Sequence, residues 1–196
     1  MKQTQLTELL LQSLEHERGG ILVYETALQC AVNDDLRKEW GHYLDQTRNH
    51  VRILVQTCQS LKIDPEAPSE GRNVVRFLGK SLVEAMQTAL KAGNPTAAEL
   101  VACECVVLAE TKDHLDWELI KAYGNAARGE EGTILTSAAV EVEDEEDEHL
   151  YHTKGWCREL WLKSLGLKSV LPPPEEVKHV TTAIGAARAE QAAHPK

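Results

Sequence analysis

Aromatic residues make up only 5% of this 196-residue sequence, and Phe occurs once. No stretch alternates apolar and polar residues in the β-branched pattern that is typical of strands. No apolar run is long enough to span a bilayer, and the opening MKQTQLTELL lacks the continuous apolar core of a signal peptide. We therefore predict an all-α, cytoplasmic protein that has no membrane partner.

Basic residues are also scarce, because 21 Lys and Arg stand against 31 Asp and Glu, which gives a formal net charge of −10. Binding to a nucleic-acid backbone depends mainly on Lys and Arg, so we expect no nucleic-acid partner. The acidic balance is compatible with cation binding, and it is equally common among ordinary cytosolic proteins.

The sequence has no CxxC pair, and its number of cysteines is odd. Cys103 and Cys105 are two residues apart, so on a helix their side chains point in different directions. This pattern predicts reduced thiols that act mostly as small buried apolar residues. The five cysteines are Cys30, Cys58, Cys103, Cys105 and Cys157.

Clear punctuation divides the chain into helices. Asn33 and Asp34 can end one helix and cap the next, Asn94 can cap a helix with Pro95 in its first turn, and DPEAPSEG, RGEEG and LPPPEE are breaks. The predicted helices are 3–32, 35–63, 73–92, 95–128 and 133–165. Short turns join the first two and the last two, which predicts a four-helix bundle of two antiparallel hairpins joined by a crossover that contains a short helix. The bundle domain is assigned to residues 1–167. A Pro-rich linker and an Ala-rich tail, with a possible short helix from Pro174, are assigned to 168–196.

Polar residues interrupt the apolar stripe of each long helix, where core positions recur at steps of three and four. The interrupting residues are Glu17 in the first helix, Thr47 and His50 in the second, Glu110 and Asp113 in the fourth, and Glu146 and His149 in the fifth.

These residues also share one height along the bundle. Reflection through the first turn brings Glu17 opposite His50, and reflection through the last turn brings Glu146 and His149 opposite the segment 110–114. Several carboxylates buried together are costly unless a cation compensates their charge. Oxygen and imidazole ligands suit iron, manganese or zinc, and a Glu-x-x-His pair places both donors on one side of a helix. The sequence therefore predicts a transition-metal site.

With this pattern, residues 1–165 resemble the ferritin-like superfamily of di-iron carboxylate bundles, and within it a group of small bacterial stress-associated proteins. The segment DDLRKEWGHYLDQTRNHVRIL and the later KAYG carry part of this resemblance. The superfamily places an acidic ligand on the first and third bundle helices and Glu-x-x-His on the second and fourth. The resemblance thus implies Glu17, then Glu110 or Asp113, then Glu146 with His149 as metal ligands, together with His50.

The second bundle helix departs from the superfamily pattern, because Thr47 stands where a Glu is expected. The resemblance therefore implies one or two ions of iron (or manganese or zinc), with the second site in doubt or shifted toward Asp113 or His114. If iron binds, it implies ferrous oxidation by oxygen or peroxide in a stress response. Tyr24 is expected to hydrogen-bond a ligand. Enzyme activity itself does not follow from the sequence.

Two other interpretations stay open. In a metal-free structural or interaction bundle, Glu17 would pair with Arg48 or Arg52, and the acids of the run around Glu146 would be solvated. In a mononuclear bundle of the thiol-transferase type, His50 and His149 would bind zinc or nickel with a third histidine.

The remaining histidines and one apolar segment complete the sequence predictions. His114 and His152 are secondary ligand candidates, and the other histidines, His16 among them, are predicted to lie on the surface. The segment GWCRELWLKSLGL, residues 155–167, is apolar enough to form a homodimer contact.

Overall fold

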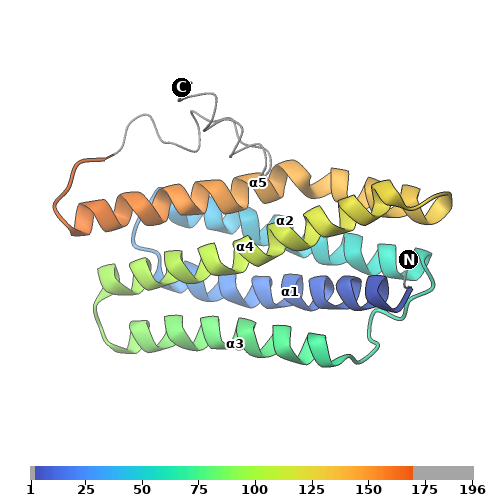
Figure 1. Ribbon diagram of the computed structural model, residues 1–196. Helices are drawn as coiled ribbons and strands as arrows, with labels where there is room; N and C mark the ends of the chain where they lie inside the picture. Colours follow the sequence, from blue (N-terminus) through green and yellow to red (C-terminus); the bar gives the residue numbers. More distant parts are fainter. Residues whose placement is uncertain (1–2, 170–196) are drawn as a thin grey trace, which may run out of the picture.

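The computed structural model describes residues 3–169, and all regular secondary structure within that range is helical (Figure 1). The prediction of an all-α chain is confirmed, and every predicted helix end lies within three residues of the observed one. The predicted tail helix from Pro174 lies outside the described residues. None of the described helices combines the length and apolar character needed to cross a membrane. The helices are α1 (Gln3–Cys30), α2 (Asp34–Ser60), α3 (Glu70–Lys91), α4 (Pro95–Ala126) and α5 (Glu130–Ser164).

Side-chain caps begin three of these helices. The side chain of Asn33 accepts hydrogen bonds from the first backbone N–H groups of α2, and Asn94 does the same for α4, with Pro95 in the first turn. Ser69 caps α3. The predicted caps are thus confirmed, and they satisfy N–H groups that have no partner within the helix. At α5 the chain turns at Gly129, whose φ of 76° is a conformation that favours glycine.

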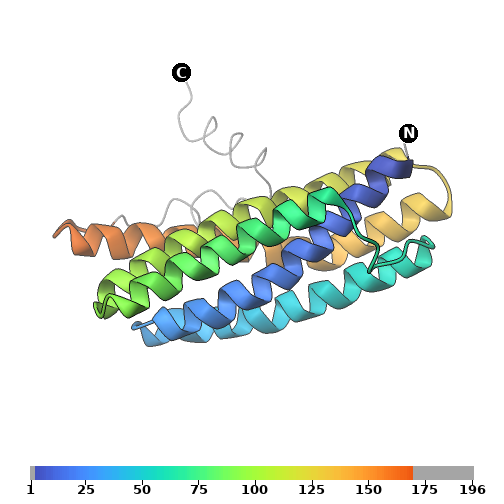
Figure 2. The same ribbon diagram turned by 90° about the horizontal axis from the view of Figure 1, so that it is seen from below.

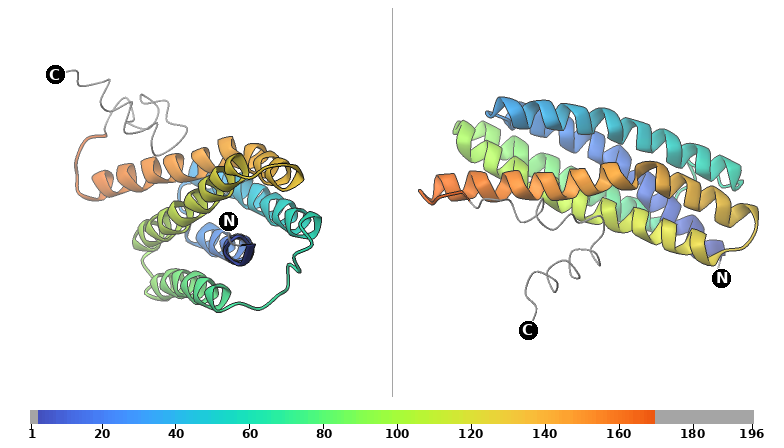
Figure 3. Two further views of the ribbon diagram at one scale, coloured as in Figure 1. Left: turned by 45° about the vertical axis from the view of Figure 1, so that its right-hand side comes forward. Right: turned by 90° about the horizontal axis from the view of Figure 1, so that it is seen from above.

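Four helices surround a common axis, and the fifth lies outside them. α1 packs against α2 and α4, and α5 packs against the same two helices, which closes the ring. α3 packs on the outer side of α1 and α4, as the end-on view on the left of Figure 3 shows. Figure 2 shows that α3 runs along the length of the bundle, and along the chain it connects the hairpin α1–α2 to the hairpin α4–α5. The structure is therefore a helical bundle with a helical crossover.

The apolar core is split into two clusters. One is built around Tyr24, Trp40 and Cys103, and the other around Leu10, Leu54 and Ile120. In each of the four ring helices, the stretch between the two clusters carries buried polar side chains. A polar layer therefore crosses the middle of the bundle, between two apolar ends.

A buried ion pair fastens the crossover helix to the ring. The Arg72 guanidinium, which is 4% exposed, donates to Glu15 of α1 at 2.9 and 3.2 Å and to the carbonyls of Pro65 and Ala67 in the preceding loop. Arg76 donates to the second Glu15 oxygen at 2.6 Å. These bonds fix the start of α3 against α1 and connect the loop to the bundle.

Candidate metal centre

All the predicted ligand residues lie in the polar layer, and each is almost fully buried. Exposure is 4% or less for every one of them. Because face and height along the bundle were the two criteria in the sequence, their common burial confirms that the helices bring these side chains inward at one level. The residues are Glu17 of α1, His50 of α2, Glu110 and Asp113 of α4, and Glu146 and His149 of α5.

Five of these six residues form two groups that share one carboxylate. In the first group, His50 Nδ1 lies 3.0 Å from Glu146 Oε1 and 3.4 Å from Glu17 Oε1. In the second, His149 Nδ1 lies 3.5 Å from Glu110 Oε2 and 3.8 Å from the same Glu146 oxygen. Within each group the ligand atoms all lie within 4.8 Å of one another, a spacing at which they could hold a metal ion. Glu146 therefore stands between two adjacent three-residue groups.

Outer hydrogen bonds orient both imidazoles toward the centre. His50 Nε2 lies 2.7 Å from Glu145 Oε2, and His149 Nε2 lies 3.0 Å from the Gln46 side-chain oxygen. Each of these partners accepts a hydrogen bond, so Nε2 carries the proton, and the neutral ring would present the Nδ1 lone pair to the groups described above. Trp117 donates to Glu17 Oε1 at 2.8 Å and holds that carboxylate in the same way.

The inner atoms, in contrast, are buried and have no hydrogen-bond partner among the described residues. They lie near one another without forming aligned hydrogen bonds, which is expensive for polar groups in a protein interior. A bound cation would satisfy all of them together. These atoms are Glu17 Oε2, His50 Nδ1, Glu110 Oε2, Asp113 Oδ1, both Glu146 carboxylate oxygens and His149 Nδ1.

The protonation of the layer follows from its crowded charges. Burial lowers the pKa of His50, but the Glu17 and Glu146 carboxylates outweigh it and raise that pKa to about 11. His149 shows the same direction because of Glu110. Burial and the Glu17 charge raise the pKa of Glu146 to about 7.

For Glu110, burial acts to raise the pKa, but the His149 imidazolium outweighs it, so the pKa is lowered. Asp113 has no such partner. Burial, followed by the charges of Glu17 and Glu146, raises its pKa well above the ordinary value. Without a cation, the layer thus holds protons on its imidazoles and on Asp113.

The second bundle helix supplies no carboxylate to the inner groups. The Thr47 hydroxyl donates to the Tyr43 carbonyl of its own helix at 2.9 Å. Its methyl group faces Gly20, where an added Cβ would lie 3.3 Å from Thr47 Cγ2. Asp113 is buried in the same layer on α4 but belongs to neither three-residue group. The layer is therefore asymmetric, with two acids from α4 and none from α2.

The metal-free interpretation expected Glu17 to pair with Arg48 or Arg52. The structure gives these arginines other partners, because Arg48 pairs with Glu25 and Asp45, and Arg52 lies against Glu141.

The histidine predictions also need correction. His16, predicted on the surface, is partly buried, with Nε2 3.0 Å from the Ala109 carbonyl oxygen. His114 is buried but pairs with Asp147 at 2.7 Å, and His152 Nδ1 lies 3.1 Å from the Tyr43 hydroxyl. Neither of these last two joins an inner group. The buried Tyr24 hydroxyl forms no well-aligned hydrogen bond among the described residues, but it lies close enough to the predicted ligand Glu110 to help lower the pKa of that carboxyl.

The sequence reasoning did not identify four residues that support the site. Three of them, Gln46, Trp117 and Glu145, hydrogen-bond a predicted ligand. The fourth, Asp147, pairs with the neighbouring His114. Trp117 follows Asp113 by four residues and so lies on the same face of α4, which was the one available signal. Glu145 belongs to the acidic run beside Glu146 and is partly buried against His50.

Comparisons of this chain with models of protein families, with curated proteins and with solved structures found no match.

Proposed function

We propose that this chain binds two divalent transition-metal ions in the middle of the bundle, with Glu146 as the ligand common to both. One observation carries the proposal: both Glu146 oxygens are buried without a hydrogen-bond partner, and the residue belongs to both three-residue groups. Glu17 and His50 complete one site, and Glu110 and His149 complete the other. This assignment of two sites goes further than the sequence, where one or two ions were left open.

The ligand chemistry favours iron or manganese. Each group offers two carboxylates and one imidazole. This oxygen-rich donor set suits iron or manganese, whereas thiolate ligands, which select copper or zinc, are absent from both groups. A mononuclear site made from three histidines is disfavoured, because neither His114 nor His152 belongs to a three-residue group, and His114 is paired with Asp147.

The order of ligands along the chain supports a ferritin-like arrangement, with an acid on α1, a histidine on α2, an acid on α4 and Glu-x-x-His on α5. In that arrangement, bound iron would supply one-electron redox chemistry toward dioxygen or peroxide. The protein's own contribution is to hold the carboxylates in place, to keep Nδ1 of each imidazole inward through Glu145 and Gln46, and to exclude water with the two flanking apolar clusters.

Metal titration of single variants tests the proposal. Purified protein is stripped with a chelator and titrated without oxygen with Fe(II) or Mn(II), and binding is followed by calorimetry and elemental analysis. We expect about two ions for the native chain, about one each for Glu17→Gln and Glu110→Gln, and none with high affinity for Glu146→Gln. Asp144→Asn, an exposed acid of the same helix, is the matched control and should leave the stoichiometry unchanged.

A native chain that takes up no transition metal would refute the proposal and favour a metal-free interaction bundle. Equal single-ion stoichiometry in the native chain and in Glu110→Gln would refute the two-ion arrangement while leaving one site.

A further inference from the structure

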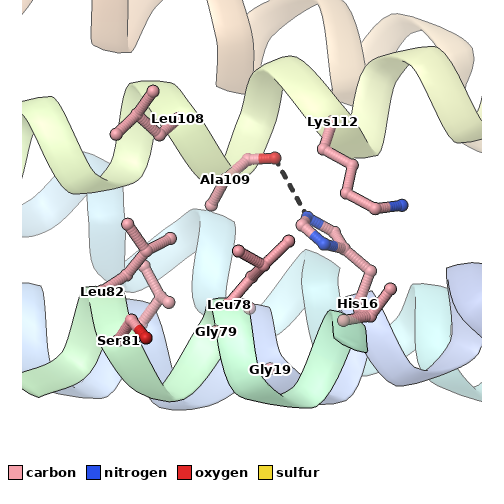
Figure 4. A pocket seen from close by; sticks show the side chains of 12 residues that line it. His16, Gly19, Leu78, Gly79, Ser81, Leu82, Leu108, Ala109 and Lys112 are labelled. Atoms are coloured by element: carbon pink, nitrogen blue, oxygen red, sulfur yellow. Dashed lines mark hydrogen bonds between the residues drawn. The ribbon is translucent and has the colours of Figure 1, made fainter. Parts of the chain in front are cut away.

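A second feature of interest is a cavity of about 270 Å³ on the outer side of the ring, where α1, α3 and α4 meet (Figure 4). It exists because small residues face it: Gly19 on α1 approaches Gly79 on α3, and Ala109 covers the inner wall from α4. A Cβ added at Gly79 would lie 3.7 Å from the Gly19 Cα, so the two helices run close together along the floor.

The cavity is apolar at one end and polar at the other. Leu82, Leu108 and Ser81 line the apolar end, and His16 and Lys112 lie together at the opposite end (Figure 4). Leu108 is 62% exposed, so the apolar end opens to the surface.

The polar end carries the one charged side chain of the described lining residues, Lys112, which takes part in an ion pair. In a chain with a net charge of −10, no acidic residue lines this cavity, and Lys112 is the one charged side chain among the described residues that do. His16 Nε2 lies 3.0 Å from the Ala109 carbonyl oxygen and donates its proton to it. Lys112 already pairs with Asp116, but an ammonium group has three N–H donors and can bind a second acceptor.

We propose that this cavity binds a small amphipathic carboxylate, with its hydrocarbon chain among the leucines of α3 and α4 and its carboxylate on Lys112. The volume sets the size of the ligand. At protein-like packing density, 270 Å³ holds about ten to twelve non-hydrogen atoms, which corresponds to a fatty acid of roughly eight to ten carbons. The charge of the lining sets the class of the ligand, because Lys112 is the one charged side chain among the described lining residues and favours an anion with an apolar body over a neutral or cationic one.

The cavity and the metal layer are neighbours on the same helices but are built from different side chains. His16 and Ala109 each directly precede a proposed ligand, Glu17 and Glu110, yet they line the cavity and belong to neither three-residue group. Binding of the carboxylate does not depend on bound metal, so the two proposals can fail separately.

The experiment uses the full metal-free chain and titrates it with decanoate, and with 1-decanol as the uncharged counterpart, by calorimetry. We expect one decanoate per chain. Ser81→Leu fills the apolar end and should weaken decanoate binding by at least about tenfold. Its control is Thr88→Leu, on the same helix outside the cavity, because both hydroxyls donate to the carbonyl four residues earlier. Circular dichroism checks folding, and Leu108→Trp at the open end serves if Ser81→Leu does not fold.

The charged end is tested by Lys112→Met, with the exposed Lys91→Met as its control. We expect Lys112→Met to weaken decanoate by about tenfold and to change decanol binding by less than about twofold.

Three results would overturn the proposal. The first is a native chain that binds no decanoate up to about 1 mM, a limit that corresponds to roughly −4 kcal/mol. The second is an equal affinity for Ser81→Leu and Thr88→Leu. The third is a sedimentation measurement in which the native chain dimerises and Ser81→Leu does not, because a second copy would then occupy the cavity.

Discussion

Replacing Glu146 with Gln should stabilise the metal-free protein, although it removes the central ligand of the proposed metal site. Gln has the same shape as Glu but carries no charge, and the pKa of Glu146 is raised from an ordinary 4.5 to about 7 by burial and by Glu17. Such a rise corresponds to roughly 3 kcal/mol of unfavourable free energy for the ionised carboxylate in the folded chain.

The stability gained in Glu146→Gln should depend on pH, because it comes from the raised pKa of Glu146. An acid whose pKa is raised on folding binds its proton more tightly in the folded state, so its penalty begins above pH 4.5 and is complete above pH 7. At pH 8, Glu146→Gln should therefore unfold about 6–12 °C higher than the native chain in the presence of a chelator. At pH 4, where Glu146 is protonated in both states, the two proteins should unfold at nearly the same temperature.

Added metal should reverse the order. Each ion that binds only the folded native chain stabilises it by mass action, by about 3 kcal/mol at a hundredfold excess over its dissociation constant, so the two proposed ions together exceed the gain of roughly 3 kcal/mol from Glu146→Gln. Calorimetric melting of both proteins at pH 4 and pH 8, with chelator and with Mn(II), measures all of these differences. The reasoning is refuted if Glu146→Gln is less stable than the native chain at pH 8 with chelator, or if its gain is the same at both pH values.

Three further predictions concern stability and ligand orientation. Glu15→Gln should lower the free energy of unfolding by about 3 kcal/mol in urea, because it leaves a buried arginine unpaired. Burial acts to raise the pKa of Glu15, but its two arginine partners outweigh burial and lower that pKa. The stability that the Glu15 carboxylate contributes is therefore complete above pH 4.5 and is lost as the pH falls further, and this pH dependence should be missing from the variant. Trp117→Phe removes the N–H that holds Glu17 and should weaken metal binding about tenfold in a titration, with little change in helix content by circular dichroism. Gly124→Ala should cost about 2 kcal/mol in thermal melts because its Cβ would lie 2.8 Å from a backbone nitrogen of α5, whereas Gly41→Ala, with open space around it, should be neutral or slightly stabilising.

The level of the polar layer could be predicted because two simple rules act on the same residues. Helical periodicity decides which face Glu17 and His149 occupy, and the short turns decide their height. The five helices were predicted from caps and breakers for the same reason: Asn33 and Asn94 act locally, and no distant contact overrides them.

The partners of the layer could not be predicted in this way, because they depend on interhelical distances and side-chain rotamers. Asp147 follows Glu146 and should point about 100° away from it, toward solvent or toward α4. It is buried because α4 and α5 pack closely, and His114 then meets it. Likewise, Glu145 reaches His50 only because α5 lies against α2 at this height. The homodimer contact predicted for residues 155–167 stays a prediction, although Trp161 and Leu165 are exposed there.

The charges of the layer are partly balanced in the metal-free chain. The pKa values of the two imidazoles are raised by the carboxylates that face them, and the raised pKa of Asp113 favours its protonated form. If the two proposed divalent ions bind, each imidazole must give up its Nδ1 proton to become a ligand, and ionisation of Asp113 would bring the number of carboxylates to four against four positive charges. Such an exchange of protons for cations would keep the change in buried charge small. Asp113 would then contribute, from another helix, the charge that Thr47 does not, within a layer that the two apolar clusters enclose.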